Sequence, residues 1–557
     1  MRKLLWISLC LAVLVSLSSA QQHGSHPYRG GAPAGMGEAM RAVNADHIRA
    51  DDRFLSSDLL EGRGTGARGG DIAAEFIADQ FAIAGLEPAG DNGTYLQRVP
   101  MVGIATQPGT TLRIVTPKQT LDLRQLDDAV IMDESQQTLS DLDSDVIFMG
   151  YGITAPEFGW DDYAGVDVKG KVLLMLVNEP PSDDPKFFAG KSLTFYGRWV
   201  YKYEQASRMG AAGVILIHKT EMASYGWNVV RNSWSGERSY LGGGEEPGLH
   251  LAAWVQLDQA RKMIDDSGKD LDQLIADAGR RGFKPFAVPL HVKAHIISTV
   301  RPFTVSNVIG RIPGSDPALK EQAIIVTGHY DHLGIRPEMK GNNIYHGALD
   351  NGTGTAMVLE IARALGAAPV KPRRSVYLAC VTAEEQGLRG SEYLVRHPPV
   401  PPNQISLDLN FDMVPPFGLP REISAEGYDR TSVAPLFEKV ASDFKLKVVY
   451  PEHPESGGYY RSDHFSFARH GVPAFSINTG GEFDGHPAEW VKKNEEDVAK
   501  NYHQPSDEFH EDFDFRSNAV VARFAIALVY WAGDEPRVAQ WKAGDEFELR
   551  RKAQFAQ

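Results

Sequence analysis

The chain has 557 residues but only two cysteines, Cys10 and Cys380. Cys10 lies in an N-terminal segment that we expect to be removed, which leaves one cysteine and no internal disulfide bond. Cys380 ends the apolar run SVYLAC, where a small buried side chain is a better interpretation than a nucleophile. Disulfide-stabilised folds and cysteine-dependent catalysis are therefore both disfavoured.

Positive charge is also scarce. The chain has 57 lysines and arginines against 72 aspartates and glutamates, for a formal net charge of −15. An acidic chain of this kind is a poor candidate for binding nucleic acid or an anionic membrane surface. We therefore expect no nucleic-acid partner.

Long apolar runs are missing after the N-terminal segment. The chain begins MRKLLWISLCLAVLVSLSSAQQ, where Arg2 and Lys3 precede a short apolar stretch and small residues follow it. An uncleaved membrane anchor is the alternative, but the stretch is shorter than the about 20 apolar residues of a membrane span. The pattern predicts a signal peptide over residues 1–20, cleaved near Ala20, export to the periplasm or the outside of the cell, and no membrane span after cleavage.

The chain is too long for one hydrophobic core, so we expect several parts. Residues 21–40 are rich in Gly, Pro, His and Ser, which indicates a flexible lead-in. Residues 111–302 alternate short β-like runs with turns and helices, which indicates an inserted α+β domain. The main domain then comprises residues 41–110 and 303–535, and residues 536–557 form a charged C-terminal tail.

From about residue 303, strands and helices alternate. QAIIVTG, SVYLACVTA and ISLDLNF are typical of buried strands. GTAMVLEIARALG is typical of a helix, because Val358, Ile361, Ala362 and Leu365 recur at helical spacing. Strands that alternate with helices form a parallel sheet covered on both faces. The predicted fold class is α/β, with a mostly parallel central sheet flanked by helices.

Histidines and acids follow the ends of these strands. They are His329, Asp331, Asp350, Glu384, Glu385, Asp412 and His503. Ligands of an open parallel sheet bind outside the carboxyl ends of its strands, so these side chains should meet at one edge. Such residues without cysteine suit zinc in a hydrolytic site, with cobalt or manganese as alternatives. They outnumber the ligands of one catalytic zinc, and a carboxylate that bridges two metals accounts for the surplus.

Six motifs occur in a fixed order along the chain. They are GHYDHLG, GALDNGTGTA, TAEEQGLRGSEYL, NFDMV, SDHFSF with GVPAFSI, and YHQPSDEF. Together they resemble peptidase family M28, which includes co-catalytic zinc aminopeptidases and glutamate carboxypeptidases. The resemblance covers roughly residues 40–110 and 303–532 and implies the zinc exopeptidase fold with two zinc ions. The segment between them resembles the protease-associated (PA) domain that many members carry as an insertion.

The resemblance implies a role for each metal ligand. Asp350 would bridge the two zinc ions. His329 and Asp412 would complete one metal site, and Glu385 and His503 would complete the other.

Three further residues take catalytic roles from the same resemblance. Glu384 would be the general base that moves a proton from the metal-bound water to the leaving amine. Asp331 would orient His329, as metal-bound imidazoles generally require. Tyr459 would polarise the scissile carbonyl, with the adjacent Tyr460 as the alternative.

Two neighbours of these residues compete with them. Asp408 lies four residues before Asp412, and the NFDM context favours Asp412. His332 lies inside the first motif, but we interpret it as a supporting residue rather than a ligand.

The resemblance implies a peptide substrate and an exported zinc exopeptidase, with an aminopeptidase as the leading hypothesis. A glutamate-releasing carboxypeptidase is the alternative, and the bases that could hold its substrate carboxylate are Arg389, Arg421 and Arg461. A one-zinc cyclase of the same fold is disfavoured because all five ligand positions are filled. A non-catalytic binding or receptor protein is disfavoured because the base is present as well. We expect the inserted domain to shape access to the cleft.

Overall fold

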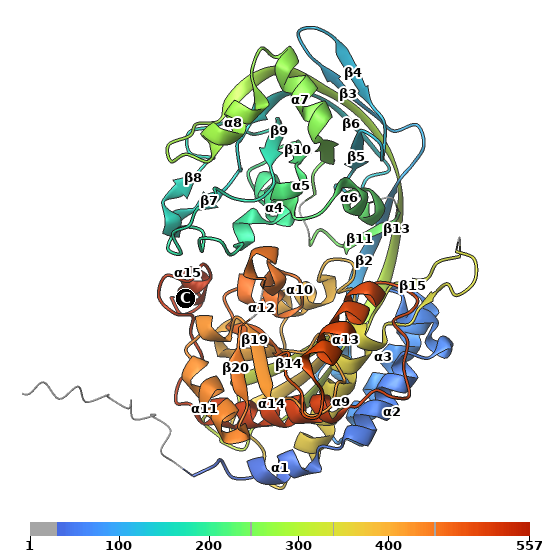
Figure 1. Cartoon of the computed structure of the whole chain (residues 1–557), viewed down its shortest axis with the longest axis vertical. Coiled ribbons are helices and arrows are strands. Elements are labelled where there is room, and N and C mark those ends of the chain that lie inside the picture. Colours follow the sequence, from blue (N-terminus) through green and yellow to red (C-terminus); the bar gives the residue numbers. More distant parts are fainter. Residues whose placement is uncertain (1–30, 235, 246–247, 338, 451–452, 557) are drawn as a thin grey trace, which may run out of the picture. The chain divides into compact units, whose positions relative to one another are not determined.

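The computed structural model describes residues 31–556, apart from 235, 246–247, 338 and 451–452 (Figure 1). The predicted signal peptide, residues 1–20, lies outside the described residues, as does the lead-in up to residue 30. Residues 32–557 cluster into one unit. Among the helices of the described part, none combines the length and hydrophobicity that crossing a membrane requires.

A mostly parallel sheet forms the centre of the main domain. Its parallel strands lie in the order β17 (Ser375–Val381), β14 (Ala323–His329), β18 (Ile405–Asn410) and β21 (Ala474–Thr479). Antiparallel strands extend both edges: β13 (Phe286–Ile312), β1 (Glu87–Pro88) and β2 (Leu96–Thr106) beyond β17, and β19 (Glu422–Glu426) with β20 (Lys447–Val449) beyond β21. A short pair, β15 (Gly334–Ile335) and β16 (Ile344–Tyr345), lies outside the sheet. The predicted α/β class is confirmed.

Helices cover both faces of this sheet. They are α1 (Met36–Ala42), α2 (Ala45–Leu55), α3 (Arg68–Ile83), α9 (Thr353–Ala367), α10 (Arg389–Arg396), α11 (Ala434–Phe444), α12 (His464–Arg469), α13 (Ala488–Asn501), α14 (Arg516–Asp534) and α15 (Glu548–Ala553). α9 contacts β14 and β17, and α14 contacts β21. α12 contacts β18 and β21 and packs on α10, on the side of the strands away from α14 (Figure 1). α9 is buried almost throughout its length, because the sheet and the helices α2 and α14 enclose it.

The inserted segment has a sheet of its own. That sheet contains β3 (Thr111–Val115), β4 (Thr120–Leu123), β5 (Ala129–Met132), β6 (Leu139–Phe148), β9 (Val172–Leu176), β10 (Gly213–His218) and β12 (Leu251–Gln256). Of the segment's other strands, β7 (Thr154–Ala155) and β8 (Trp160–Asp161) form a separate pair, and β11 (Arg238–Leu241) pairs with β2 of the main domain. Its helices are α4 (Trp199–Arg208), α5 (Thr220–Ala223), α6 (Trp227–Ser233), α7 (Leu257–Asp266) and α8 (Leu271–Ala278). β6, β9, β10 and β12 are parallel neighbours in that order. The resemblance of this segment to a PA domain stays a prediction.

One strand, β13, takes part in both sheets. It is 27 residues long. Its first half pairs with β6 and β3 of the insertion, and its second half pairs with β2 and β17 of the main domain. The boundary predicted between residues 302 and 303 therefore falls inside a continuous strand, because the two sheets share that strand instead of being joined by a linker.

The start of the described chain is helical. Residues 36–40, which we predicted to belong to a flexible lead-in, lie in α1. Met36 and Ala39 of this helix are buried, and α1 contacts α9 and α14. The prediction is wrong for these residues, because a small apolar face is enough to fix the helix on a preformed surface.

The charged tail after residue 535 is also part of the fold. Trp541 and Phe547 are buried, and Arg551 is fully buried in α15. The Arg551 guanidinium donates to the carbonyl oxygens of Ile405 at 2.8 Å and Pro402 at 3.0 Å, at the start of β18. The tail therefore closes the amino end of the central strands.

Candidate metal centre

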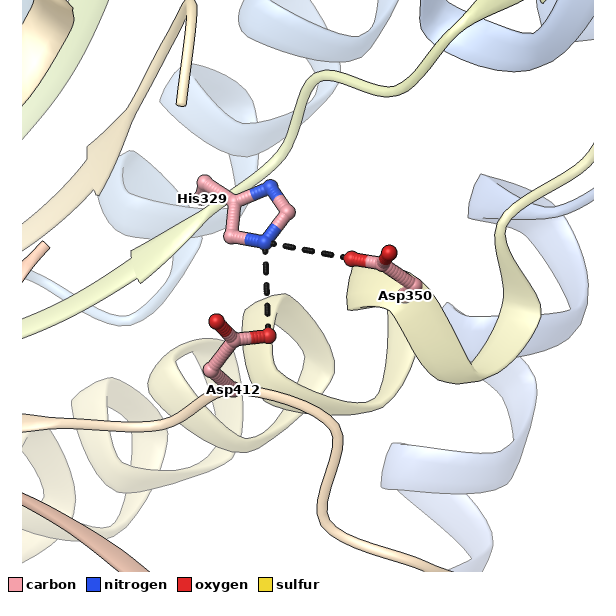
Figure 2. Close-up of side chains that lie close together, drawn as sticks. All are labelled: His329, Asp350 and Asp412. Atoms are coloured by element: carbon pink, nitrogen blue, oxygen red, sulfur yellow. Dashed lines mark ion pairs between the residues drawn. The ribbon is translucent and has the colours of Figure 1, made fainter. Parts of the chain in front are cut away.

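The carboxyl ends of β14, β17 and β18 bring the predicted ligands together. His329 is the last residue of β14, and Asp412 follows β18 by two residues. Asp350 lies in the turn that precedes α9. His329 Nε2 is 3.4 Å from Asp350 Oδ1 and 3.4 Å from Asp412 Oδ1 (Figure 2).

These distances fit three ligands of one tetrahedral metal. Ligand atoms at about 2.0–2.1 Å from a tetrahedral zinc are about 3.3–3.4 Å from one another. His329 Nε2 and Asp412 Oδ1 are buried, and neither has a hydrogen-bond partner among the described residues. Buried polar atoms usually have such a partner, and a metal ion would serve as one. The residues present therefore fit a zinc ion.

The charges of this cluster favour a cation. Burial lowers the pKa of His329, but the carboxylates of Glu384, Asp412 and Asp350 outweigh burial and raise it well above its ordinary value. Burial raises the pKa of Asp350, but the imidazoles of His329 and His503 beside it hold that pKa well below its usual range. A divalent ion supplies the positive charge that such a cluster requires.

A second cluster shares Asp350 with the first. His503 Nε2 is 3.1 Å from Asp350 Oδ2 and 3.1 Å from Glu385 Oε2. Burial lowers the pKa of His503, but its bonds to these two carboxylates raise it to about 10. One oxygen of Asp350 thus faces each cluster, which is the arrangement that a bridging carboxylate needs.

His332 lies beside the second cluster. Ligand atoms of His332, Asp350 and Glu385 lie within 4.8 Å of one another. However, His332 Nδ1 is 2.6 Å from Glu385 Oε1, which is shorter than the separation of two ligands of one zinc and matches a charge-assisted hydrogen bond. We therefore keep the interpretation that His332 supports Glu385.

Asp408, the alternative to Asp412, lies away from both clusters. It lies within β18, and its Oδ1 accepts a hydrogen bond from Thr327 Oγ1 at 3.0 Å. Among the described residues, His329, Asp350 and Asp412 form a group whose ligand atoms lie close enough together to hold a metal ion, and Asp408 belongs to no such group. The geometry therefore supports the choice of Asp412.

Comparison with known proteins gives the family of this part of the chain. Residues 307–529 match the model described as "Peptidase family M28". This segment is an M28 peptidase domain. Similar curated proteins include "Leupeptin-inactivating enzyme 1" of Streptomyces exfoliatus, 31% identical over 214 residues, which are 37% of this chain and 44% of that protein. "Leucine aminopeptidase 2" of Trichophyton rubrum is 29% identical over 320 residues, which are 55% of this chain and 54% of that protein.

The chain therefore spans about half the length of these curated relatives of the M28 domain. Among solved structures, "Aminopeptidase from Aneurinibacillus sp. strain AM-1" aligns with a TM-score of 0.49 and 19% identity. That alignment covers 90% of this chain and 97% of the other.

Within the M28 domain, Asp331 orients His329 through its main chain. His329 Nδ1 donates to the carbonyl oxygen of Asp331 at 3.1 Å, which leaves the Nε2 lone pair facing the two aspartates. The nearest Asp331 carboxylate oxygen is 3.9 Å from His329. Those oxygens accept instead from the Glu384 N–H at 3.1 Å and from Thr65 Oγ1 at 3.0 Å. The hydrogen bond of the ring is therefore made with the Asp331 main chain, because two other donors engage the Asp331 carboxylate.

Tyr459 does not reach the metal ligands. Its hydroxyl donates to the Ala474 carbonyl oxygen at 3.0 Å, and its ring packs edge-on against His464. The adjacent Tyr460 donates to Glu546 Oε1 at 2.6 Å. The predicted role of Tyr459 in polarising the substrate is therefore wrong, and the alternative with Tyr460 fails for the same reason.

A cleft of about 1060 Å³ opens beside Asp350, Asp412 and Glu384. Tyr502 lines this cleft and stacks on His503, with ring centroids 3.8 Å apart. Tyr502 is 47% exposed, but partial loss of hydration in the cleft and the nearby carboxylates raise the pKa of its hydroxyl, which therefore keeps its proton and can donate. Tyr502 was missed although it stands directly before His503 in the motif YHQPSDEF.

Asp507, in the same motif, was missed as well. Its Oδ1 accepts from the Leu349 N–H at 2.9 Å, and its Oδ2 accepts from the Asp350 N–H at 3.0 Å. This carboxylate holds the turn that carries the shared aspartate.

Gly347 begins the turn at φ 61°, where a Cβ would meet the Asp350 carbonyl oxygen at 2.2 Å, so the position requires glycine.

Proposed function

We propose that the chain is an exported zinc-dependent exopeptidase, and most specifically an aminopeptidase that holds two zinc ions. The observation that carries the proposal is the placement of Asp350 between two clusters of ligand atoms, with Glu384 lining the same cleft. The relatives of the M28 domain named leucine aminopeptidases support the choice of activity.

In this proposal, five side chains hold the metals. His329 and Asp412 hold one zinc ion, Glu385 and His503 hold the other, and Asp350 binds both. When bound, zinc supplies a Lewis acid that polarises the scissile carbonyl and lowers the pKa of water.

Glu384 moves the proton. Its carboxylate takes a proton from the attacking water and delivers it to the amine nitrogen that leaves. Burial, together with the charges of Glu385 and Asp412, raises its pKa, while His329 lowers it. The bond from the Glu384 N–H to Asp331 fixes the main chain from which this side chain projects.

The charges of the cleft favour a substrate amine over a substrate carboxylate. Glu426 lines the cleft and has no ion-pair partner within the part of the chain that the structure describes. Of the two bases that line it, Lys447 already pairs with Glu422 at 2.6 Å. Burial raises the pKa of Glu426 and the nearby charge of Arg461 lowers it; in its ionised form this carboxylate suits a protonated N-terminal amine. Arg461 is the other base that lines the cleft. It favours the carboxypeptidase alternative, because its guanidinium could hold a substrate carboxylate.

The test is a peptide assay on the purified mature chain, with free and blocked termini, before and after chelation and zinc return. An aminopeptidase releases N-terminal residues from free-amine peptides only, and chelation abolishes the release. Loss of C-terminal residues despite an N-terminal block would establish the carboxypeptidase. No cleavage while zinc stays bound would favour a non-catalytic binding protein.

A variant sharpens this test. Glu426→Gln should raise KM for free-amine peptides by about 10–150-fold, because an ionised hydrogen bond contributes about 1.5–3 kcal/mol. The exposed acid Glu489 on α13 provides the control, since Glu489→Gln removes the same charge away from the cleft. An unchanged KM in Glu426→Gln would remove this residue from amine recognition.

Export and the role of the insertion are parts of the same proposal. N-terminal sequencing of the secreted protein should begin at Gln21 if the signal peptide is cleaved after Ala20. We propose that the insertion, which resembles a PA domain, controls access of peptides to the cleft. Unchanged peptide preference in a folded protein without residues 111–297 would contradict that role.

A further inference from the structure

Arg63 is fully buried next to the metal centre. It ends a short turn, Asp58–Arg63, that precedes α3. Residue 63 lies far outside the segment that matches the M28 family. A buried guanidinium is costly unless its N–H groups find acceptors, so its contacts indicate what it does.

The guanidinium donates only to main-chain carbonyl oxygens. Its Nε donates to Tyr330 at 2.6 Å, its Nη1 to His346 at 2.7 Å and to Leu55, and its Nη2 to Gly347 at 2.8 Å. Tyr330 directly follows the ligand His329. Gly347 begins the turn that contains Asp350. One planar group thus joins two of the three segments that supply the ligands of the first metal cluster, the third being the loop of Asp412.

Arginine is the side chain that can make this set of bonds. It presents five N–H donors in a rigid plane, while lysine presents three donors on a single nitrogen. Among the described residues, no carboxylate lies within ion-pair distance of Arg63, so pairing with an acid does not explain its burial. Burial lowers the pKa of Arg63, and the negative charges of Asp52, Asp507, Asp331 and Asp350 oppose that shift.

The residues around Arg63 bind the same loop. The Arg63 carbonyl oxygen accepts from the His332 N–H at 3.1 Å, and Gly64 forms a β-bridge with His332. Thr65 Oγ1 donates to Asp331 Oδ2 at 3.0 Å. The segment therefore contacts the loop after β14 through both main chain and side chains.

We propose that Arg63, with Thr65 beside it, is a positioning residue of the metal centre. It fixes the loop of His329 and the turn of Asp350 at the separation that one metal ion needs, and touches neither substrate nor metal. The inference rests on the proposed zinc site and adds that this site is incomplete without the N-terminal segment.

The test compares two buried arginines. Arg63→Lys and Arg63→Gln remove the bridge between the two loops. Arg374 is the matched control, because it is also fully buried and donates to the carbonyl oxygens of Ala532 at 2.6 Å and Gly533 at 3.1 Å. Arg374 precedes β17, at the amino end of the parallel strands and away from the ligands.

Three quantities are measured on the full chain: the zinc dissociation constant by competition with a chromophoric chelator, kcat and KM at saturating zinc, and Tm. Residues that support metal ligands typically change metal affinity by about 10–100-fold when they are replaced. We expect Arg63→Lys to weaken zinc binding by that factor and to lower kcat with little change in KM. Arg374→Lys should lower Tm while the zinc constant and kcat stay at parental values.

Two results would overturn the proposal. One is a parental zinc constant and kcat in Arg63→Lys. The other is an equal loss of zinc affinity in the Arg374 variant, because the effect would then reflect general stability. If the Arg63 variants do not fold, the Thr65 variants test the proposal instead. Thr65→Val removes the hydroxyl that donates to Asp331 and should weaken zinc binding, whereas Thr65→Ser keeps the hydroxyl and should bind zinc like the parent. Parental zinc binding in Thr65→Val would end the claim.

The outcome is separable from the proposed function. If the parental chain binds zinc but cleaves no peptide, the exopeptidase proposal fails. The comparison of zinc constants between the Arg63 and Arg374 variants still decides the positioning role.

Discussion

Glu384→Gln and Glu385→Gln should differ in their effects, although the two residues are adjacent. The first should lower turnover and keep the zinc content, and the second should lower the affinity for one zinc ion. Glu384 is half-buried in the cleft, and its carboxylate makes no hydrogen bond to another described residue. Glu384 is bonded to the rest of the site through its main-chain N–H, which donates to Asp331. Glu384→Gln leaves this main-chain hydrogen bond unchanged. The substitution therefore creates no unpaired buried group, and we expect the free energy of unfolding to stay within about 0.5 kcal/mol of the parent.

The effect on turnover should be large. General-base catalysis contributes about 10²–10⁴-fold, which corresponds to about 2.7–5.5 kcal/mol of activation free energy. A glutamine amide cannot carry the proton, so kcat of Glu384→Gln should fall by this factor. The zinc content should stay at the parental value, because none of the proposed ligands changes.

Glu385→Gln provides the contrast. The carboxylate of Glu385 lies 2.6 Å from His332 Nδ1 and 3.1 Å from His503 Nε2, and these contacts lower its pKa to about 2 despite burial. An amide offers one acceptor oxygen and no charge. We expect this variant to lose affinity for one zinc equivalent while the other stays bound.

The assay combines zinc stoichiometry by elemental analysis with steady-state kinetics on one peptide. Glu384→Gln with both zinc equivalents and more than a tenth of the parental kcat would refute the general-base assignment. Loss of a zinc equivalent in the same variant would show that Glu384 is a ligand instead.

Three further outcomes are expected. Tyr459→Phe should keep kcat within about twofold and lower the free energy of unfolding by about 1 kcal/mol, because its hydroxyl bonds a main-chain carbonyl and not substrate; kinetics and urea unfolding check this, and a kcat loss above about 100-fold would restore the catalytic role. Asp412→Asn should weaken zinc binding while Asp408→Asn should not, as a zinc competition assay would reveal; equal losses would contradict the choice between them. Ending the chain after Asp534 exposes the surface that buried Trp541 and Phe547 cover, a loss of at least about 3 kcal/mol, so Tm should fall clearly below the parental value, and an unchanged Tm would mean that the tail is dispensable.

The metal ligands could be predicted because their placement follows from a rule of sheet geometry. Parallel strands present their carboxyl ends at one edge, so His329 and Asp412 had to approach each other once their strands were recognised. The choice between Asp408 and Asp412 rests on the NFDM motif, and the structure agrees with it, because Asp408 lies inside the strand and accepts a hydrogen bond from Thr327 on the neighbouring strand.

Contacts of loops could not be predicted in the same way. Tyr459 lies three residues before Ser462 in a loop with no repeating geometry, so its spacing does not reveal that its hydroxyl meets Ala474. Asp331 was identified correctly as a neighbour of His329, but which of its oxygens bonds the ring depends on Thr65, a residue that is distant in sequence.

The C-terminal tail, residues 536–557, shows that charge composition is a poor guide to burial. Its high charge suggests exposure, but Arg551 is buried because the carbonyl groups at the start of β18 need donors. Composition alone does not show where such acceptors lie.

The order in which the chain is made gives the insertion a further consequence. α3 ends at Ile83, and its partner α9 begins at Thr353. At about 5–20 residues per second, a ribosome needs about 15–55 s to make the roughly 270 residues between them. During this interval the apolar faces of α1, α2 and α3 lack the helices that later cover them, while the strands of the insertion find most of their partners nearby in sequence. The length of the insertion thus sets the delay over which the apolar faces of the first three helices are exposed to proteases and aggregation.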